Sequence, residues 1–249
     1  MGIIPLLIFF LFKINLGGIT TEIIWKIALL AVIDMGGYLF FYRALEKGKV
    51  SIVGPIVASY SALSVIIMAI FLGEKLSLPI IFFLSIIFIG IIIISIDFNE
   101  LSNYGIRKED FTKGVPEAIL GALLFSVWFP FWDKLSAGQD WLVLVLILRT
   151  ISSLFLLLFL KTSNKEVVVR DKVVFRWLII IGLLDAIAYA ALTWGYGSTN
   201  YTSIIIMLSA TYSVPTLILA RIFLKEKLQN FQKIGIFLIL LGIAALALI

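Results

Sequence analysis

The sequence predicts a polytopic all-α membrane protein, built from two inverted repeats with about nine transmembrane helices. Three observations predict this fold class: an apolar composition, a series of helix-length apolar runs, and a set of polar residues that recurs along the chain. Of the 249 residues, 62% are hydrophobic and 14% are charged, whereas soluble domains average about 45 to 50% apolar and about 25% charged residues. The mean hydropathy of +1.14 therefore favours lipid as the surroundings of most side chains.

The composition also excludes several functional classes. The chain contains no Cys and no His, which excludes thiolate and imidazole metal sites, Ser-His-Asp and Cys-His nucleophiles, and a disulfide framework. The sequence therefore predicts no cofactor, no metal site and no enzyme. The net charge of +5 comes from basic residues clustered between apolar runs, which is typical of membrane-protein loops and disfavours nucleic acid as a partner.

Apolar runs of membrane-spanning length follow one another along the chain. A bilayer core of about 30 Å requires about 20 mostly apolar helical residues. Eight such runs are predicted, at residues 23–45, 51–72, 78–97, 115–137, 141–160, 174–196, 201–224 and 231–249. Residues 2–16 form a partial ninth segment, which Lys13 and Asn15 interrupt.

Polar residues recur with a separation of about 152 residues. A shift of 152 aligns Ser59-Tyr60-Ser61 with Thr211-Tyr212-Ser213 and Glu74-Lys75 with Glu226-Lys227, and a one-residue gap aligns Asp34 and Tyr38 with Asp185 and Tyr189. Apolar identities count for little between Ile/Leu-rich helices, but polar matches in one order indicate a duplication. The period leaves room for five helices per copy, and an odd number turns the second copy upside down. Secondary transporters use such inverted repeats around a midplane site.

Each copy also carries a short motif near its end. In the second copy, Pro215 precedes a Leu224-Lys225-Glu226-Lys227-Leu228 box, and the last helix contains Gly235 and Gly242; the first copy has Leu72-Gly73-Glu74-Lys75-Leu76 and Gly90, with Leu63 in place of the proline. These motifs resemble the EamA-like family of the drug/metabolite transporter superfamily. The resemblance implies ten helices, five per repeat. It places a first repeat that lacks its first helix at residues 1–97, a polar linker at 98–114, and a complete second repeat at 115–249.

Loop charges predict the orientation in the cell membrane. When loops are assigned alternately to the two sides, four lysines lie on one side and fifteen basic residues on the other, with Arg149 inside a span. The positive-inside rule places the more basic side in the cytoplasm. The N-terminus is therefore predicted to be cytoplasmic.

Three charged residues stand deep inside apolar spans. Asp34 and Asp185 are equivalent in the two repeats, and Arg149 is a candidate counter-ion. A carboxylate exposed to lipid costs at least about 2.5 to 3.5 kcal/mol, so each Asp must face a cavity, have a partner or be protonated. The pair can bind a proton or an amine, or can serve only as interhelical hydrogen bonds. Arg149 can hold a substrate carboxylate or neutralise one Asp.

Aromatic and hydroxyl residues are the other candidates for lining a substrate pathway. They are the pairs Tyr38 and Tyr189, Tyr60 and Tyr212, and Ser59 and Thr211, together with Trp128 and Trp194. The alternative is that the rings mark membrane interfaces and that the hydroxyls bond to their own helices. Glu74 and Glu226 belong to the family motif, but their position at helix ends favours a structural role.

The function predicted first is secondary transport of a small molecule, by alternating access. The resemblance implies an amino acid or a related solute, usually exported, and protons are the default coupling ion because no phosphate-binding loop is present. A membrane enzyme acting on lipid-linked substrates is an alternative, but the chain has no Asp-x-x-Asp pair and no His. A membrane scaffold is the other alternative, and it predicts no buried, repeat-related Asp and Tyr.

Overall fold

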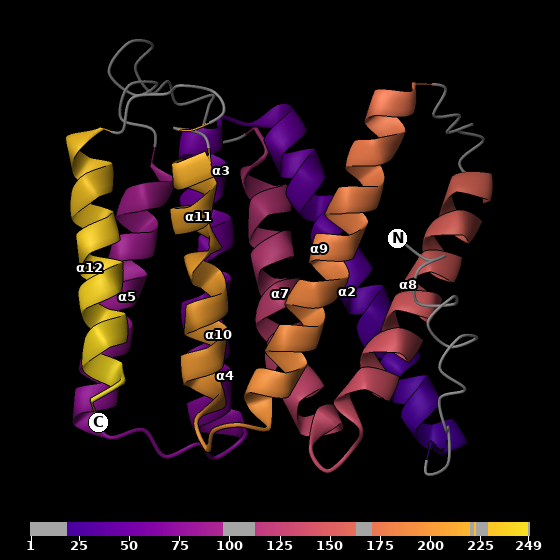
Figure 1. Ribbon diagram of the computed structural model, residues 1–249, viewed down its shortest axis with the longest axis horizontal. Helices are drawn as coiled ribbons and strands as arrows, with labels where there is room; N and C mark the ends of the chain where they lie inside the picture. The colour runs from indigo at the N-terminus through magenta and orange to yellow at the C-terminus, as the bar shows by residue number, and fades with distance from the viewer. Residues whose placement is uncertain (1–18, 97–112, 163–170, 220–221, 223–228, 249) are drawn as a thin grey trace. The chain divides into compact units, whose positions relative to one another are not determined.

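The computed structural model describes residues 19–96, 113–162, 171–219, 222 and 229–248, and its regular secondary structure is entirely helical. Figure 1 shows α2 (Thr21–Lys47), α3 (Val50–Ala58), α4 (Tyr60–Phe71), α5 (Leu78–Ser95), α7 (Val115–Ser136), α8 (Trp141–Thr162), α9 (Lys172–Tyr196), α10 (Thr202–Ser209), the 3-10 turn η2 (Ala210–Tyr212), α11 (Ser213–Leu219) and α12 (Asn230–Leu246). These elements correspond in order to the eight predicted runs.

Six helical segments among the described residues are long and apolar enough to cross a bilayer. They are Thr21–Lys47, Ile52–Phe71, Leu78–Ser95, Val115–Ser136, Trp141–Phe159 and Lys172–Tyr196. The prediction of an all-helical, multi-pass membrane protein is thereby confirmed. The two remaining runs give shorter helices, because α12 has 17 residues and the run 201–224 is broken. The partial segment at residues 2–16 lies outside the described residues.

Two predicted continuous spans are interrupted, and the interruptions lie at repeat-equivalent places. The first is at Ser59, between α3 and α4, and the second is η2, between α10 and α11. At both places a hydroxyl donates to a backbone carbonyl three residues earlier: Ser59 Oγ to Ile56 O at 2.6 Å, and Thr211 Oγ1 to Leu208 O at 2.7 Å. Such bonds compete with the regular helical ladder and bend helices. The run 201–224 is thereby divided into short helices, whereas Ile52–Phe71 stays long enough to cross a bilayer despite the break at Ser59.

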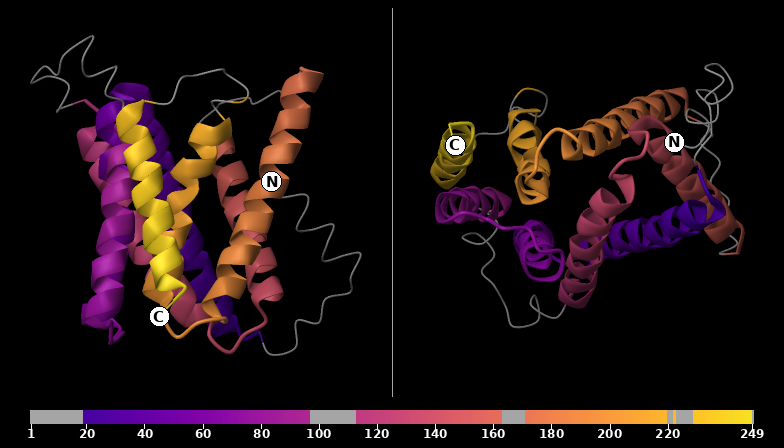
Figure 2. Two further views of the ribbon diagram at one scale, coloured as in Figure 1. Left: turned by 60° about the vertical axis from the view of Figure 1, so that its left-hand side comes forward. Right: turned by 90° about the horizontal axis from the view of Figure 1, so that it is seen from below.

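Internal packing divides the chain into two units, and each is described by itself. The first unit comprises residues 1–35 and 131–200, and the second comprises 36–130 and 201–249. In the second unit, α5 and α12 lie side by side, as Figures 1 and 2 show. A Cβ atom on Gly90 would lie 2.8 Å from Gly235 O. Small residues therefore let these two backbones approach closely, which gives the motif glycines a packing role.

In the first unit, α9 packs against α8. Its buried residues are Gly182, Tyr189, Thr193 and Tyr196, which are separated by seven, four and three positions and so lie along one stripe of the helix. Most other side chains of α9 are exposed, as expected for a lipid-facing surface. This narrow buried stripe carries polar groups rather than only apolar ones.

Glu74, in the family motif, caps α10. Its Oε1 and Oε2 atoms each lie 3.2 Å from the backbone N–H of Ser203, which donates to them, and Ser203 Oγ donates to Oε2 at 2.9 Å. Ser203 is the second residue of α10, where backbone N–H groups lack helical acceptors and a negative charge is favoured. The structure thus places Glu74 in the structural role that its position predicts.

Replacing Glu74 by alanine is expected to lower the free energy of unfolding by about 1 to 3 kcal/mol, because the Ser203 N–H and hydroxyl lose a charged acceptor. The measurement is an SDS titration followed by circular dichroism. Glu46→Ala, which removes an exposed carboxylate, is the control and should leave the midpoint nearly unchanged. In a double-mutant cycle, Ser203→Ala should cost little once Glu74 is alanine; full additivity would contradict the capping role.

Candidate functional site

A buried ionic cluster forms in the first unit, beginning with Asp34. Asp34 stands at the middle of α2, thirteen residues from Thr21 and thirteen from Lys47, and only 1% of its surface is exposed. The hydroxyl of Tyr189 donates to Asp34 Oδ1 at 2.9 Å and to Oδ2 at 3.0 Å. A carboxylate at the centre of an apolar helix is thus held by a residue of α9.

Arg149 and Asp185 complete the cluster. Arg149 Nη2 lies 2.8 Å from Asp185 Oδ2, and Arg149 Cζ lies 3.4 Å from the centre of the Tyr189 ring. The guanidinium therefore makes an ion pair with one carboxylate and a cation–π contact with the tyrosine that binds the other. Tyr189 is the common partner, since its ring contacts the cation and its hydroxyl contacts Asp34.

The cluster contains two carboxylic acids and one guanidinium. If both acids are ionised, the four side chains carry one more negative than positive charge. A net charge is expensive inside a membrane, so the arrangement is suited to taking up one proton or one cationic group.

A second group of predicted residues lies in the second unit and is aromatic. Tyr60, 6% exposed, has its ring centre 4.9 Å from that of Phe129 and 5.9 Å from that of Phe125. Trp128, 1% exposed, contacts Phe129 edge to face at 5.0 Å, and Tyr38 contacts Phe125 edge to face at 5.2 Å. These five rings form a continuous apolar surface that carries tyrosine hydroxyls.

The remaining candidates are less buried, and one of them, Tyr212, interacts with Tyr60 of the aromatic group. Tyr212 and Trp194 are largely exposed, at 51% and 62%. Ser59 and Thr211 donate their hydroxyls to carbonyls of their own helices, which is the structural alternative for such residues. The repeat-equivalent tyrosines Tyr60 and Tyr212 therefore have different surroundings.

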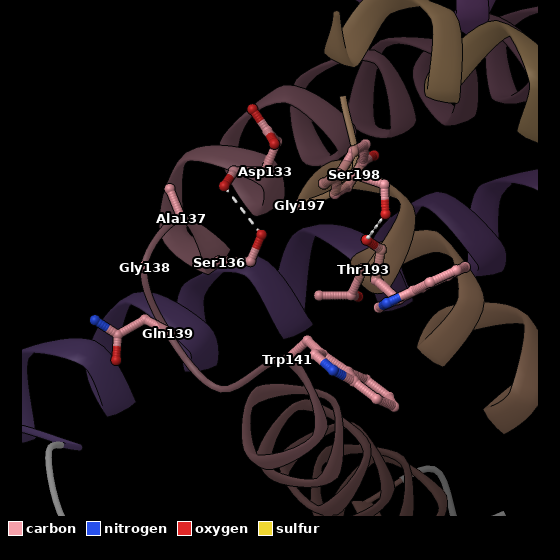
Figure 3. Close-up of a pocket in the computed structure, with 11 residues that line it drawn as sticks. Asp133, Ser136, Ala137, Gly138, Gln139, Trp141, Thr193, Gly197 and Ser198 are labelled. Atoms are coloured by element: carbon pink, nitrogen blue, oxygen red, sulfur yellow. Dashed lines mark hydrogen bonds between the residues drawn. The ribbon is translucent and has the colours of Figure 1, made fainter. Parts of the chain in front are cut away.

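A cavity of about 520 Å³ lies within the first unit, where the turn from α7 to α8 meets the end of α9. Figure 3 shows Ala137, Gly138 and Gln139 on the turn, and Thr193, Gly197 and Ser198 at the end of α9. Gly138 has φ +75°, a left-handed conformation that glycine adopts readily where a helix ends. This turn brings the start of α8 to the cavity.

Thr193 is a site residue that the sequence did not single out. Trp132 Nε1 donates to Thr193 Oγ1 at 2.9 Å, and Thr193 Oγ1 donates to Tyr189 O at 2.8 Å. Thr193 lines the cavity and is 3% exposed. The signal was available in the spacing, because Asp185, Tyr189 and Thr193 are four residues apart and so share one face of a helix.

These features define a class: a multi-pass helical membrane protein with charged groups buried among its spans, as transporters have. The model of the EamA-like transporter family matches residues 1–96 and 112–248. The chain belongs to the EamA-like transporter family, as its repeated motifs predicted, and is a membrane transporter of the drug/metabolite type.

Two other proteins are similar to this chain. An uncharacterized protein of Methanocaldococcus jannaschii is 38% identical over 96 residues, which are 39% of this chain and 70% of that protein. A crystal structure of another protein superimposes with a TM-score of 0.75 over 99% of this chain and 84% of that chain, at 17% identity. At this identity the second similarity establishes the fold alone.

Proposed function

We propose that the protein is a secondary transporter that exports an amino acid or a related small solute by alternating access. Its two repeats are inverted, with about nine helices in this chain, and its N-terminus lies in the cytoplasm. Family membership supports a small-molecule substrate and a membrane location. The matches of one family model to two regions, and the polar residues shared between them, support the repeat.

The observation that carries this proposal is the ionic cluster of Asp34, Tyr189, Arg149 and Asp185. Asp185 pairs with Arg149, and Asp34 is held by the hydroxyl of Tyr189, so the cluster with both acids ionised is neutral only after it takes up one positive charge. A proton supplies that charge in one state, and the ammonium group of a substrate supplies it in another. Exchange between the two couples substrate movement to the proton gradient.

Arg149 then binds two different carboxylates in succession. It neutralises Asp185 in the arrangement seen here, and its planar fork suits a substrate carboxylate when one arrives. An amino acid offers both groups, the ammonium for the carboxylates and the carboxylate for the guanidinium. Tyr189 holds Asp34 through its hydroxyl.

The experiment is solute-driven proton movement in proteoliposomes with a trapped pH indicator. The native protein should move protons when a transported amino acid is added, and Asp34→Asn and Asp185→Asn should reduce the signal to that of protein-free liposomes, because each removes a titrating acid of the cluster. Glu22→Gln is the matched control on α2, since Glu22 is exposed and pairs only locally with Lys26 at 2.6 Å. Undiminished proton movement in both Asp variants would overturn the assignment.

A further inference from the structure

We propose that the cavity between the α7–α8 turn and the end of α9 is a binding site for small solutes that carry an ammonium group, through which they reach or leave the ionic cluster. The second half of this inference rests on the proposed function. The binding site itself stands on the chemistry and position of the cavity.

The lining of the cavity suits a cation. Among its described lining residues, Asp133 is the charged one and none is Lys or Arg. Three aromatic residues, Trp141, Trp194 and Tyr196, also line it, and aromatic rings attract ammonium groups through their electron-rich faces. The volume of about 520 Å³ lies within the roughly 300 to 1,000 Å³ of small-molecule pockets. The cavity therefore attracts a small organic cation and disfavours a small anion.

The position of the cavity connects it to the ionic cluster. Thr193 lies on the cavity wall, and Tyr189 and Asp185 follow on the same face of α9 at intervals of four residues. Each interval is about 6 Å along a helix axis. A solute at Thr193 is therefore about one turn from the tyrosine that binds Asp34 and about two turns from the Arg149 ion pair.

A chain of hydrogen bonds joins the cavity wall to the helix turn that carries Tyr189. Trp132 is fully buried, and its indole N–H donates to Thr193 Oγ1, whose own hydroxyl donates to Tyr189 O. The Thr193 side chain on the cavity wall is thereby fixed relative to the residue that binds Asp34.

Charge in the cluster gives the same selectivity as the cavity. In the cluster beyond Thr193 the acids outnumber the guanidinium by one. Moving inward is therefore electrostatically favourable for a cation and unfavourable for a simple carboxylate. Two separate groups of residues on one face of α9 thus favour the same ligand. The site is therefore expected to recognise the ammonium group of a solute and not the rest of the molecule.

The absence of Cys from the chain permits a direct test. Ser198→Cys and Gln139→Cys place single thiols on opposite walls of the cavity. The full-length protein in detergent is treated with trimethylammonium-ethyl methanethiosulfonate, and the rate of labelling is measured by mass spectrometry. Three competitors of similar size are compared: phenethylamine, neutral 2-phenylethanol and anionic phenylacetate. Glu46→Cys, at an exposed position near the end of α2, is the control outside the cavity, and it is preferred to Leu157→Cys because α8 is a membrane-spanning segment that a charged reagent does not enter.

Phenethylamine at about ten times its Kd should slow labelling of both cavity thiols about tenfold, whereas phenylethanol and phenylacetate should leave the rates unchanged. Labelling of Glu46→Cys should respond to none of them. Equal protection by all three competitors, or protection by none, would overturn the site. This binding assay does not require transport. If it fails while solute-driven proton movement is intact, the cavity site is wrong and the proposed coupling stands. If phenethylamine protects the thiols but no proton movement is measured, the proposed coupling is wrong and the binding site stands.

Discussion

Replacing Arg149 by leucine is expected to lower the free energy of unfolding by about 3 kcal/mol, the lower end of the range for buried pairs, because the Asp185 side chain that loses its partner keeps 22% of its surface exposed. Asp185 would then lack its guanidinium, and Tyr189 would lose the cation over its ring. An SDS titration followed by circular dichroism measures the change. Asp171→Ala is not a suitable control because that side chain caps α9; Glu22→Gln, exposed at the start of α2, is suitable.

The double variant Arg149→Leu with Asp185→Leu separates the ion pair from the function. Removing both partners replaces a buried pair by apolar groups, which is often nearly neutral for stability. The double variant should therefore recover most of the stability that Arg149→Leu loses, yet should not transport. Recovery of stability together with transport would show that the pair only supports the fold. No recovery at all would show that Arg149 stabilises the protein through other contacts.

Replacing Tyr60 by alanine is expected to cost about 3 to 5 kcal/mol of stability, as truncation of a large buried ring does. Its ring packs against Phe125 and Phe129, and alanine leaves that space empty. Tyr60→Phe keeps the ring, so it should retain most of the stability. The repeat-equivalent Tyr212→Ala is the internal control, since Tyr212 is 51% exposed and should lose far less. Similar losses at both tyrosines would contradict the asymmetry of the two surroundings.

Hydropathy predicted most of the fold because the bilayer imposes one simple length requirement on every span. α2, α7 and α8 begin and end within two residues of the predicted runs. The breaks at Ser59 and η2 were missed because the runs 51–72 and 201–224 are apolar on average, and that average hides the hydroxyl residues clustered at the breaks. Their signal was hydroxyl chemistry: Ser59 and Thr211 bond to carbonyls of the preceding turn.

The sequence predicted which residues form the candidate site, but not which of them contact one another. Charges are so rare in these spans that Asp34, Asp185 and Arg149 stood out from sequence alone. Sequence could not decide which tyrosine holds Asp34, because Tyr38 and Tyr189 occupy equivalent places and only packing separates them. Thr193 was missed because a mid-helix threonine usually bonds to its own helix, which it also does here, toward Tyr189 O.

The two helix breaks differ in the prolines beside them: Pro55 precedes the break at Ser59, whereas Pro215 follows the one at η2. What the two places share is a hydroxyl that donates to the carbonyl three residues earlier. A proline kink is built into the covalent structure, whereas a bend held by a hydroxyl hydrogen bond can straighten when that bond is exchanged. Both breaks are thus held by contacts that can be remade.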